Sequence, residues 1–78
     1  MLKKKKFSLL ARFVVDTNGK KIGESISVYE DLLIIKKDDD YYAIPLKHVE
    51  VKNNKIHLRG IVQWDKAKEL AERWIKNV

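Results

Sequence analysis

The chain has 78 residues, no cysteine, 36% charged residues and a formal net charge of +6. Its length allows one domain with a small hydrophobic core, and the missing cysteines exclude disulfides, thiolate metal sites and thiol catalysis. No apolar run approaches the roughly 18 residues of a membrane-spanning helix, so we expect no membrane insertion.

Residues 1–6 form a basic tail. The tail holds most of the net charge in Lys3, Lys4, Lys5 and Lys6, because the other 74 residues carry 13 basic and 11 acidic side chains. Such a tail can contact phosphate or anionic lipid, or can simply be solvated. The apolar segment 7–15 imitates a signal peptide, but Arg12 interrupts it and no small-residue cleavage site precedes Asp16. We therefore expect a cytoplasmic protein, and a Lys-rich, cysteine-free composition is compatible with a thermophilic source.

Residues 7–60 predict a series of short strands. The first strand covers 7–15 and ends at a tight turn containing Asp16 and Gly19. A second strand is expected from Lys20 to about Tyr29, where Gly23 indicates a bulge or a close backbone approach. Residues 32–36 are apolar on both faces, which is typical of a central strand.

Three further short strands are expected after the acidic turn at 37–40. The first covers 41–44 and ends at Pro45, because proline has no N–H to donate to a ladder. The other two cover 49–51 and 56–58, joined by a two-residue loop at Asn53 and Asn54, since Asn tolerates left-handed backbone. We predict a mainly β protein, a small five- to six-stranded antiparallel barrel.

The apolar period becomes helical after Gly60. Apolar side chains then share one stripe, at Trp64, Ala67, Leu70, Ala71, Trp74, Ile75 and Val78. Residues 61–78 therefore predict a C-terminal amphipathic helix within the same domain, with Asp65 as its N-cap. The two tryptophans can cover the core of their own chain, or part of the stripe can meet a second subunit.

The order of these features resembles the PRC-barrel domain family. The resemblance is carried by the Gly19 turn with Ile22 and Gly23, the apolar strand 32–35, the triplet Ile44-Pro45-Leu46, and the positions Val49, Ile56 and Leu58. It covers roughly residues 9–60, and the minimal barrel of that family lacks the C-terminal helix. The resemblance implies a non-catalytic docking domain, as in ribosome maturation factors and a photosynthetic reaction-centre subunit. Free-standing archaeal members resemble small self-associating adaptors.

Candidate catalytic and metal-binding residues are few. His48 and His57 can share a metal with Glu50 if their strands come together, but surface-strand histidines are the simpler interpretation. The acidic run at 38–40 lacks the spacing and the glycine of a calcium loop, and predicts a solvated hairpin tip. No nucleophile elbow or phosphate loop is visible, so we expect no enzyme, no cofactor and no metal.

Two function classes remain. We predict a protein-interaction adaptor that forms a homodimer, with contact residues drawn from Tyr41, Tyr42, Trp74, Ile75 and Val78. The alternative is a nucleic-acid-binding barrel, in which an exposed tyrosine stacks on a base. Its phosphate contacts would come from Lys3, Lys4, Lys5, Lys6, Lys47, Lys52, Lys55 and Arg59.

Overall fold

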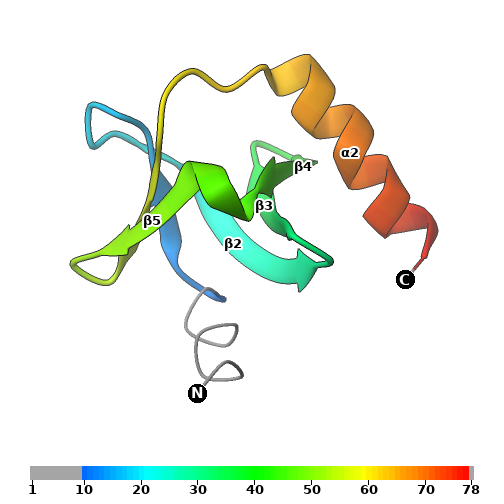
Figure 1. The fold of residues 1–78 in the computed structure, drawn as a ribbon, viewed down its shortest axis with the longest axis horizontal. Coiled ribbons are helices and arrows are strands. Elements are labelled where there is room, and N and C mark those ends of the chain that lie inside the picture. Colours follow the sequence, from blue (N-terminus) through cyan, green and yellow to red (C-terminus); the bar gives the residue numbers. More distant parts are fainter. Residues whose placement is uncertain (1–9, 78) are drawn as a thin grey trace.

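The computed structural model describes residues 10–77, which form a curled sheet and one C-terminal helix (Figure 1). The elements in chain order are β1 (Phe13–Val15), β2 (Lys21–Tyr29), β3 (Leu32–Lys37), β4 (Asp40–Pro45), the 3-10 turn η1 (Leu46–His48), β5 (Val49–Lys52), β6 (Lys55–Leu58) and α2 (Trp64–Lys76). The predicted fold class, mainly β with a C-terminal helix, is confirmed.

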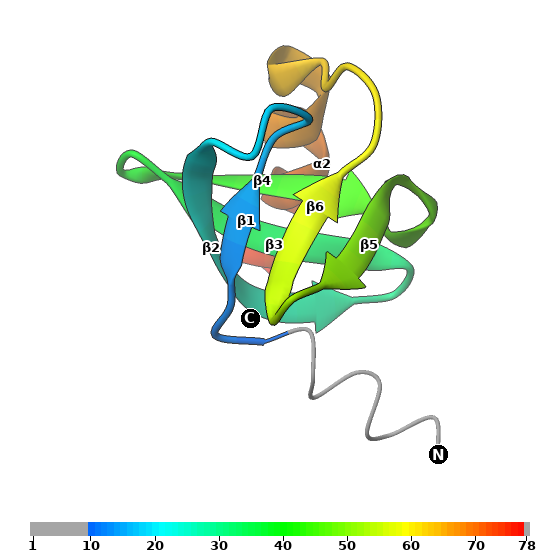
Figure 2. The same ribbon diagram turned by 90° about the vertical axis from the view of Figure 1, so that its left-hand side faces the viewer.

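The sheet is mixed and open, so the prediction of a closed antiparallel barrel is wrong. Its six strands lie in the order β4-β3-β2-β1-β6-β5, and β1 and β6 run parallel. Figure 2 shows β1, β6 and β5 side by side, with β3 and β4 crossing behind them as a half-barrel. Pro45 ends the β4 ladder, and η1 then carries the chain away, so that β6 meets β1 and β5 becomes the far edge.

The predicted turns are confirmed in detail. Asp16 Oδ1 accepts hydrogen bonds from the backbone N–H groups of Asn18 and Lys20, each at 2.9 Å, and Gly19 has φ +81°. Asn53 and Asn54 have φ +53° and +64° and close the β5–β6 hairpin. These local signals place both turns because each depends on a few adjacent residues.

The first strand is shorter than expected. Described residues 10–12 precede β1 as a bend, with Ala11 at φ +58°, while 7–9 lie outside the described residues. A Cβ at Gly23 would collide with the Lys36 carbonyl oxygen, which confirms the close backbone approach. The register of β2 is irregular at two places: beside Gly23, where Ile22 is the extra residue opposite Val14 and Val15 of β1, and between Ser25 and Ser27 opposite β3.

The core has two layers because β3 is buried on both faces. The inner cluster lies inside the curl and contains Val14, Leu33, Ile35, Ile44, Ile56, Leu58 and Ala67. The outer cluster contains Leu32, Ile34, Ala43 and Ala71. Ala67 and Ala71 both belong to α2, so the helix lies across the edge strand β4 and contributes to both layers (Figure 1). Its N-cap is Gln63, whereas Asp65, the predicted cap, lies in the first turn.

Candidate functional site

The predicted aromatic contact residues lie against the helix of their own chain. Tyr41 packs edge-to-face on Trp74, with ring centroids 5.5 Å apart, and Tyr42 packs on Trp64 at 5.1 Å. The two tyrosines point to opposite faces of β4, as alternation requires, yet α2 reaches both faces. The Lys37 ammonium lies 5.0 Å from the Trp64 ring centroid. Both tyrosines are therefore partly buried by aromatic contacts within their own chain.

The remaining predicted contact residues are placed differently. Ile75 is 46% exposed and lies on the surface of α2. Val78 lies outside the described residues. Among the predicted contact residues that the structure describes, Ile75 is the one whose side chain is largely exposed and could contact a partner.

A groove of about 540 Å³ lies where the half-barrel stays open. It is bounded by the end of β4, by η1, by the first half of α2, and by the linker, residues 59–63, that joins β6 to α2. Its apolar lining is formed by Ala43, Ile44, Pro45, Ile61, Val62, Ala67 and Leu70. Its volume lies in the range of protein ligand pockets, roughly 300–1,000 Å³.

The two adjacent apolar residues of the linker point in opposite directions, Ile61 outward and Val62 inward. Val62 packs against the inner cluster, whereas Ile61 is 97% exposed at the rim of the groove. Gly60, with φ +70°, permits the turn that precedes Ile61. An exposed isoleucine beside an apolar groove forms a continuous apolar surface. Exposing this surface to water is unfavourable, and such surfaces are typical of sites that bind a partner.

The polar rim of the groove is basic. It is lined by His48, Arg59, Gln63 and Lys66, and no acidic side chain of residues 10–77 lines it. Arg59 lies 3.6 Å from Glu50 in an exposed ion pair, while Lys66 has no ion pair within residues 10–77. An anionic segment would therefore meet attractive charge along this rim.

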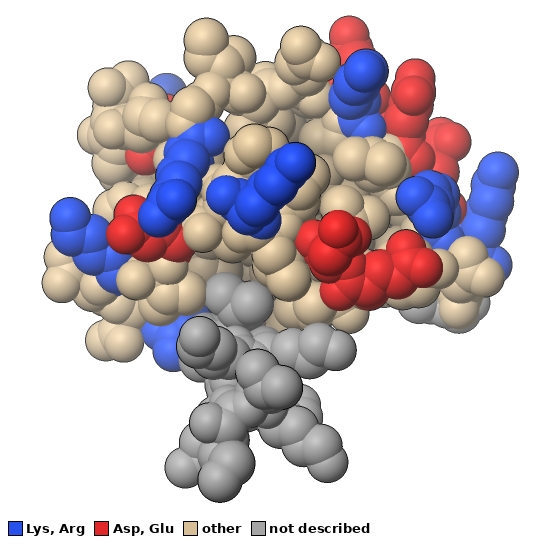
Figure 3. All heavy atoms as spheres, viewed as in Figure 1, with Lys and Arg blue, Asp and Glu red and all other residues tan. Residues whose placement is uncertain are grey.

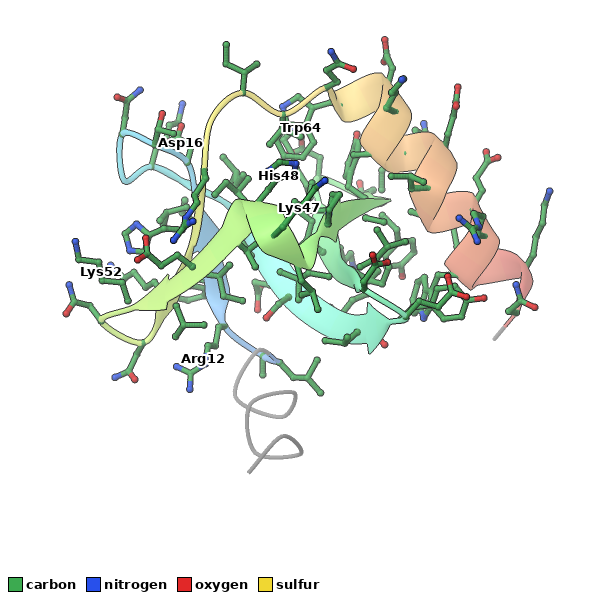
Figure 4. The ribbon with its side chains drawn as sticks, in the orientation of Figure 1. Arg12, Asp16, Lys47, His48, Lys52 and Trp64 are labelled. Carbon is green, nitrogen blue, oxygen red and sulfur yellow. The ribbon has the colours of Figure 1, made fainter. Side chains whose placement is uncertain are left out.

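The cations named in the nucleic-acid alternative follow the β5–β6 side of the molecule. Lys52 and Lys55 face each other across the β5–β6 ladder, Lys47 lies on η1, and Arg59 follows β6. Figure 3 shows basic side chains over η1 and β5, and both basic and acidic side chains over α2. In Figure 4, Lys47 and His48 lie between Lys52 at the hairpin and Trp64 at the helix start. Lys3, Lys4, Lys5 and Lys6 lie outside the described residues.

The candidate metal ligands are not assembled into a site. His57 faces Glu50 across the hairpin and its Nε2 is buried without a hydrogen-bond partner, whereas His48 lies exposed on η1. Within residues 10–77, no three His, Asp or Glu side chains could hold a metal ion. At the acidic tip, Asp38 pairs with Lys37 at 3.3 Å and Asp40 with Lys68 at 3.5 Å. The same described residues contain no helix long and apolar enough to cross a membrane.

Sequence reasoning missed the groove. Ile61 and Val62 are adjacent apolar residues, and no local pattern distinguishes the outward one from the inward one. Lys66 is one of several helix lysines, and only the position of α2 across β4 brings it to the rim.

Comparison with known proteins identifies the family of the chain. No curated protein matches the sequence. A family model described as a family of unknown function, DUF5749, matches residues 10–78. The match covers the sheet, the linker and α2, and so the chain belongs to the DUF5749 family.

Proposed function

We propose that this protein is a non-catalytic adaptor whose groove binds a segment of a partner protein that is both apolar and acidic. The observation that carries the proposal is the combination of an apolar groove, a basic rim and the fully exposed Ile61. The resemblance to PRC-barrel domains supports the same reading, since it implies a docking domain.

The apolar contact supplies the affinity in this proposal. Ile61 has its whole side chain in water, and burying such a side chain is worth about 1.5–3 kcal/mol. The floor residues Ile44 and Leu70 lie beside it in the same groove. A partner side chain that enters the groove would cover these surfaces together, as the central anchors of interfaces do.

The basic rim selects the partner. Arg59 and Lys66 lie on opposite sides of the groove, one on the linker and one on α2. Carboxylates that flank an apolar anchor would meet both cations, which speeds association and disfavours basic partners. Because these cations are exposed, their contribution falls as salt rises.

The nucleic-acid alternative keeps one observation in its favour. Lys47, Lys52, Lys55 and Arg59 all come from the segment of η1, β5 and β6, and Lys52 and Lys55 form a cross-strand pair, so the cations are close in the fold, as phosphate binding requires. Its predicted stacking residues, Tyr41 and Tyr42, are packed on tryptophans, and the exposed Phe13 already has the Lys21 ammonium 4.1 Å from its ring centroid. We therefore place it second.

The test is a selection from a displayed library of random peptides against the full chain. We expect the selected peptides to be enriched in acidic and bulky apolar residues. Their addition to ¹⁵N-labelled protein should shift the amide resonances of the linker and the first half of α2. The absence of selected peptides, or shifts confined to the β5–β6 hairpin, would contradict the proposal.

A further inference from the structure

We propose that two copies of this chain associate through the outer edge of β5. The strands run antiparallel, and Val51 of one copy lies opposite Val51 of the other. No residue of β5 lines the groove, although Glu50 of β5 forms an exposed ion pair with Arg59 at the groove rim.

The edge of β5 is open. The strand ends the sheet and pairs with β6 alone. Its hairpin extends on the side of the molecule away from α2 (Figure 1). Glu50 and Lys52 are exposed, and Val51 is 44% exposed, although its neighbour across the ladder, Ile56, is completely buried. An edge strand of this kind can pair with another chain.

The hairpin geometry determines which backbone groups face outward. The two-residue loop Asn53–Asn54 makes Lys52 and Lys55 a hydrogen-bonded pair, and hydrogen-bonded and non-bonded pairs then alternate along the ladder. Val51 and Ile56 therefore form a non-bonded pair. The N–H and C=O of Val51 point away from β6, toward a second strand.

The other edge of the sheet does not offer this surface. On β4, Ala43 is buried and Pro45 has no N–H, and α2 lies across the strand. Within β5, the N–H of Val49 already donates to the Leu46 carbonyl. Val51 is therefore the natural centre of an intermolecular pair.

Charge selects the register. With Val51 on the two-fold axis, each Glu50 lies opposite Lys52 of the second copy, so two opposite-charge cross-strand pairs form. Shifting the centre to Glu50 would place Glu50 against Glu50 of the second copy, which is repulsive. Only the first register satisfies both the outward backbone groups and the side-chain charges, and it is isologous, as a two-fold dimer requires.

The contact is short, so we expect a weak dimer that forms with rising concentration. Interfaces below about 1,200 Å² are typical of transient association. A dimer of this form holds two grooves in one particle, which would raise the avidity for a partner with two binding segments.

Sedimentation equilibrium of charge variants tests the register. Lys52→Glu should weaken dimerisation by about tenfold, because both cross-strand pairs become repulsive. Glu50→Lys should weaken it similarly, and the double variant Glu50→Lys/Lys52→Glu should restore it. Lys55→Glu is the matched control, since it makes the same charge change on the inner strand of the hairpin and should have a much smaller effect.

A cysteine variant gives a second readout. In this cysteine-free chain, Val51→Cys should form a disulfide-linked dimer on mild oxidation, because paired strands bring these Cα atoms to about 5.5 Å, within the range of disulfides. Asn18→Cys, on an exposed turn, should remain largely monomeric. A monomer at all concentrations, or a dimer that the double variant fails to restore, overturns the proposal.

Discussion

At the scale of single residues, Ser25 shows how one polar group fixes the start of the sheet. It is 1% exposed, and it is the buried polar residue of the described core. Its Oγ accepts a hydrogen bond from the Arg12 N–H at 3.0 Å and donates to the Arg12 carbonyl at 3.3 Å. The Ser25 carbonyl accepts from Ala11 N–H at 2.9 Å. Together these bonds hold the bend at Ala11, which would otherwise be unfavourable at φ +58°.

Ser25→Ala should therefore destabilise the fold. The variant leaves the partly buried Arg12 N–H without its side-chain acceptor, which costs about 1 kcal/mol or somewhat more. For a domain of this size each kcal/mol lowers Tm by about 4–8 °C. Thermal unfolding followed by circular dichroism measures the change. Ser27→Ala, on the same strand, is the control and should change Tm little; equal effects would show that the Ser25 bonds contribute nothing specific.

Ile61 carries the corresponding functional prediction. Ile61→Ser should leave Tm unchanged, because the side chain is 97% exposed, but should weaken binding of selected peptides by about tenfold or more. Ile75→Ser is the control, because Ile75 is also exposed but does not line the groove, and it should leave peptide affinity unchanged. Fluorescence anisotropy of labelled peptides measures both. Equal affinities of wild type and Ile61→Ser would contradict the assignment of the groove.

At the scale of elements, α2 is held by two edge-to-face aromatic pairs, one on each side of β4. The Tyr42–Trp64 pair belongs to the inner cluster and the Tyr41–Trp74 pair to the outer one. An ion pair between Arg73 and Glu30, at 3.5 Å, joins the end of the helix to the β2–β3 turn, but both partners are exposed and contribute little. The aromatic pairs and the two buried alanines therefore account for the docking of α2.

Trp74→Ala should thus loosen the helix without affecting association. Removal of a large packed side chain costs about 3–5 kcal/mol when it is fully buried, and Trp74, which is partly buried, should cost about 2–3 kcal/mol. Urea unfolding measures this loss. Sedimentation of the variant, under conditions where it remains folded, should give the wild-type dimer constant. If the folded variant no longer dimerised, the dimer interface would lie on the apolar stripe of α2 and not on β5.

The elements also show what sequence can and cannot predict. The turns at Gly19 and Asn53 follow from adjacent residues, and the two-faced apolar run in β3 follows from burial on both sides. The pairing of β1 with β6 has no local signal, because it depends on the direction in which η1 carries the chain. Helical spacing predicts the tryptophan stripe. The groove, however, depends on how α2 lies across β4, and the sequence has no local signal for the packing of two segments that are distant in the chain.

At the scale of the whole molecule, the net charge is divided between the lysines at 3–6 and the other 74 residues. The four lysines at 3–6 account for most of the net charge of +6, and the other residues, with 13 basic and 11 acidic side chains, are nearly balanced. Among the described residues, basic side chains gather over η1 and β5 (Figure 3), and exposed ion pairs occur both there, as Arg59–Glu50, and at α2, as Asp40–Lys68. The adaptor proposal assigns function to the groove, whereas the nucleic-acid alternative assigns it to the hairpin and the tail. These two assignments predict different salt dependence.

Binding of labelled DNA and RNA at several salt concentrations separates them. Four phosphate contacts from the tail give a log–log slope of about −3.6 on duplex DNA, since each contact contributes about −0.9. If the tail alone binds, deleting residues 1–6 should abolish the binding and its salt dependence, while the affinity for selected acidic peptides stays unchanged. The alternative requires that Lys47, Lys52, Lys55 and Arg59 still bind phosphate after the deletion, with a residual slope of similar size. A residual slope that Lys52→Glu then reduces would establish the hairpin as a nucleic-acid surface and displace the adaptor proposal.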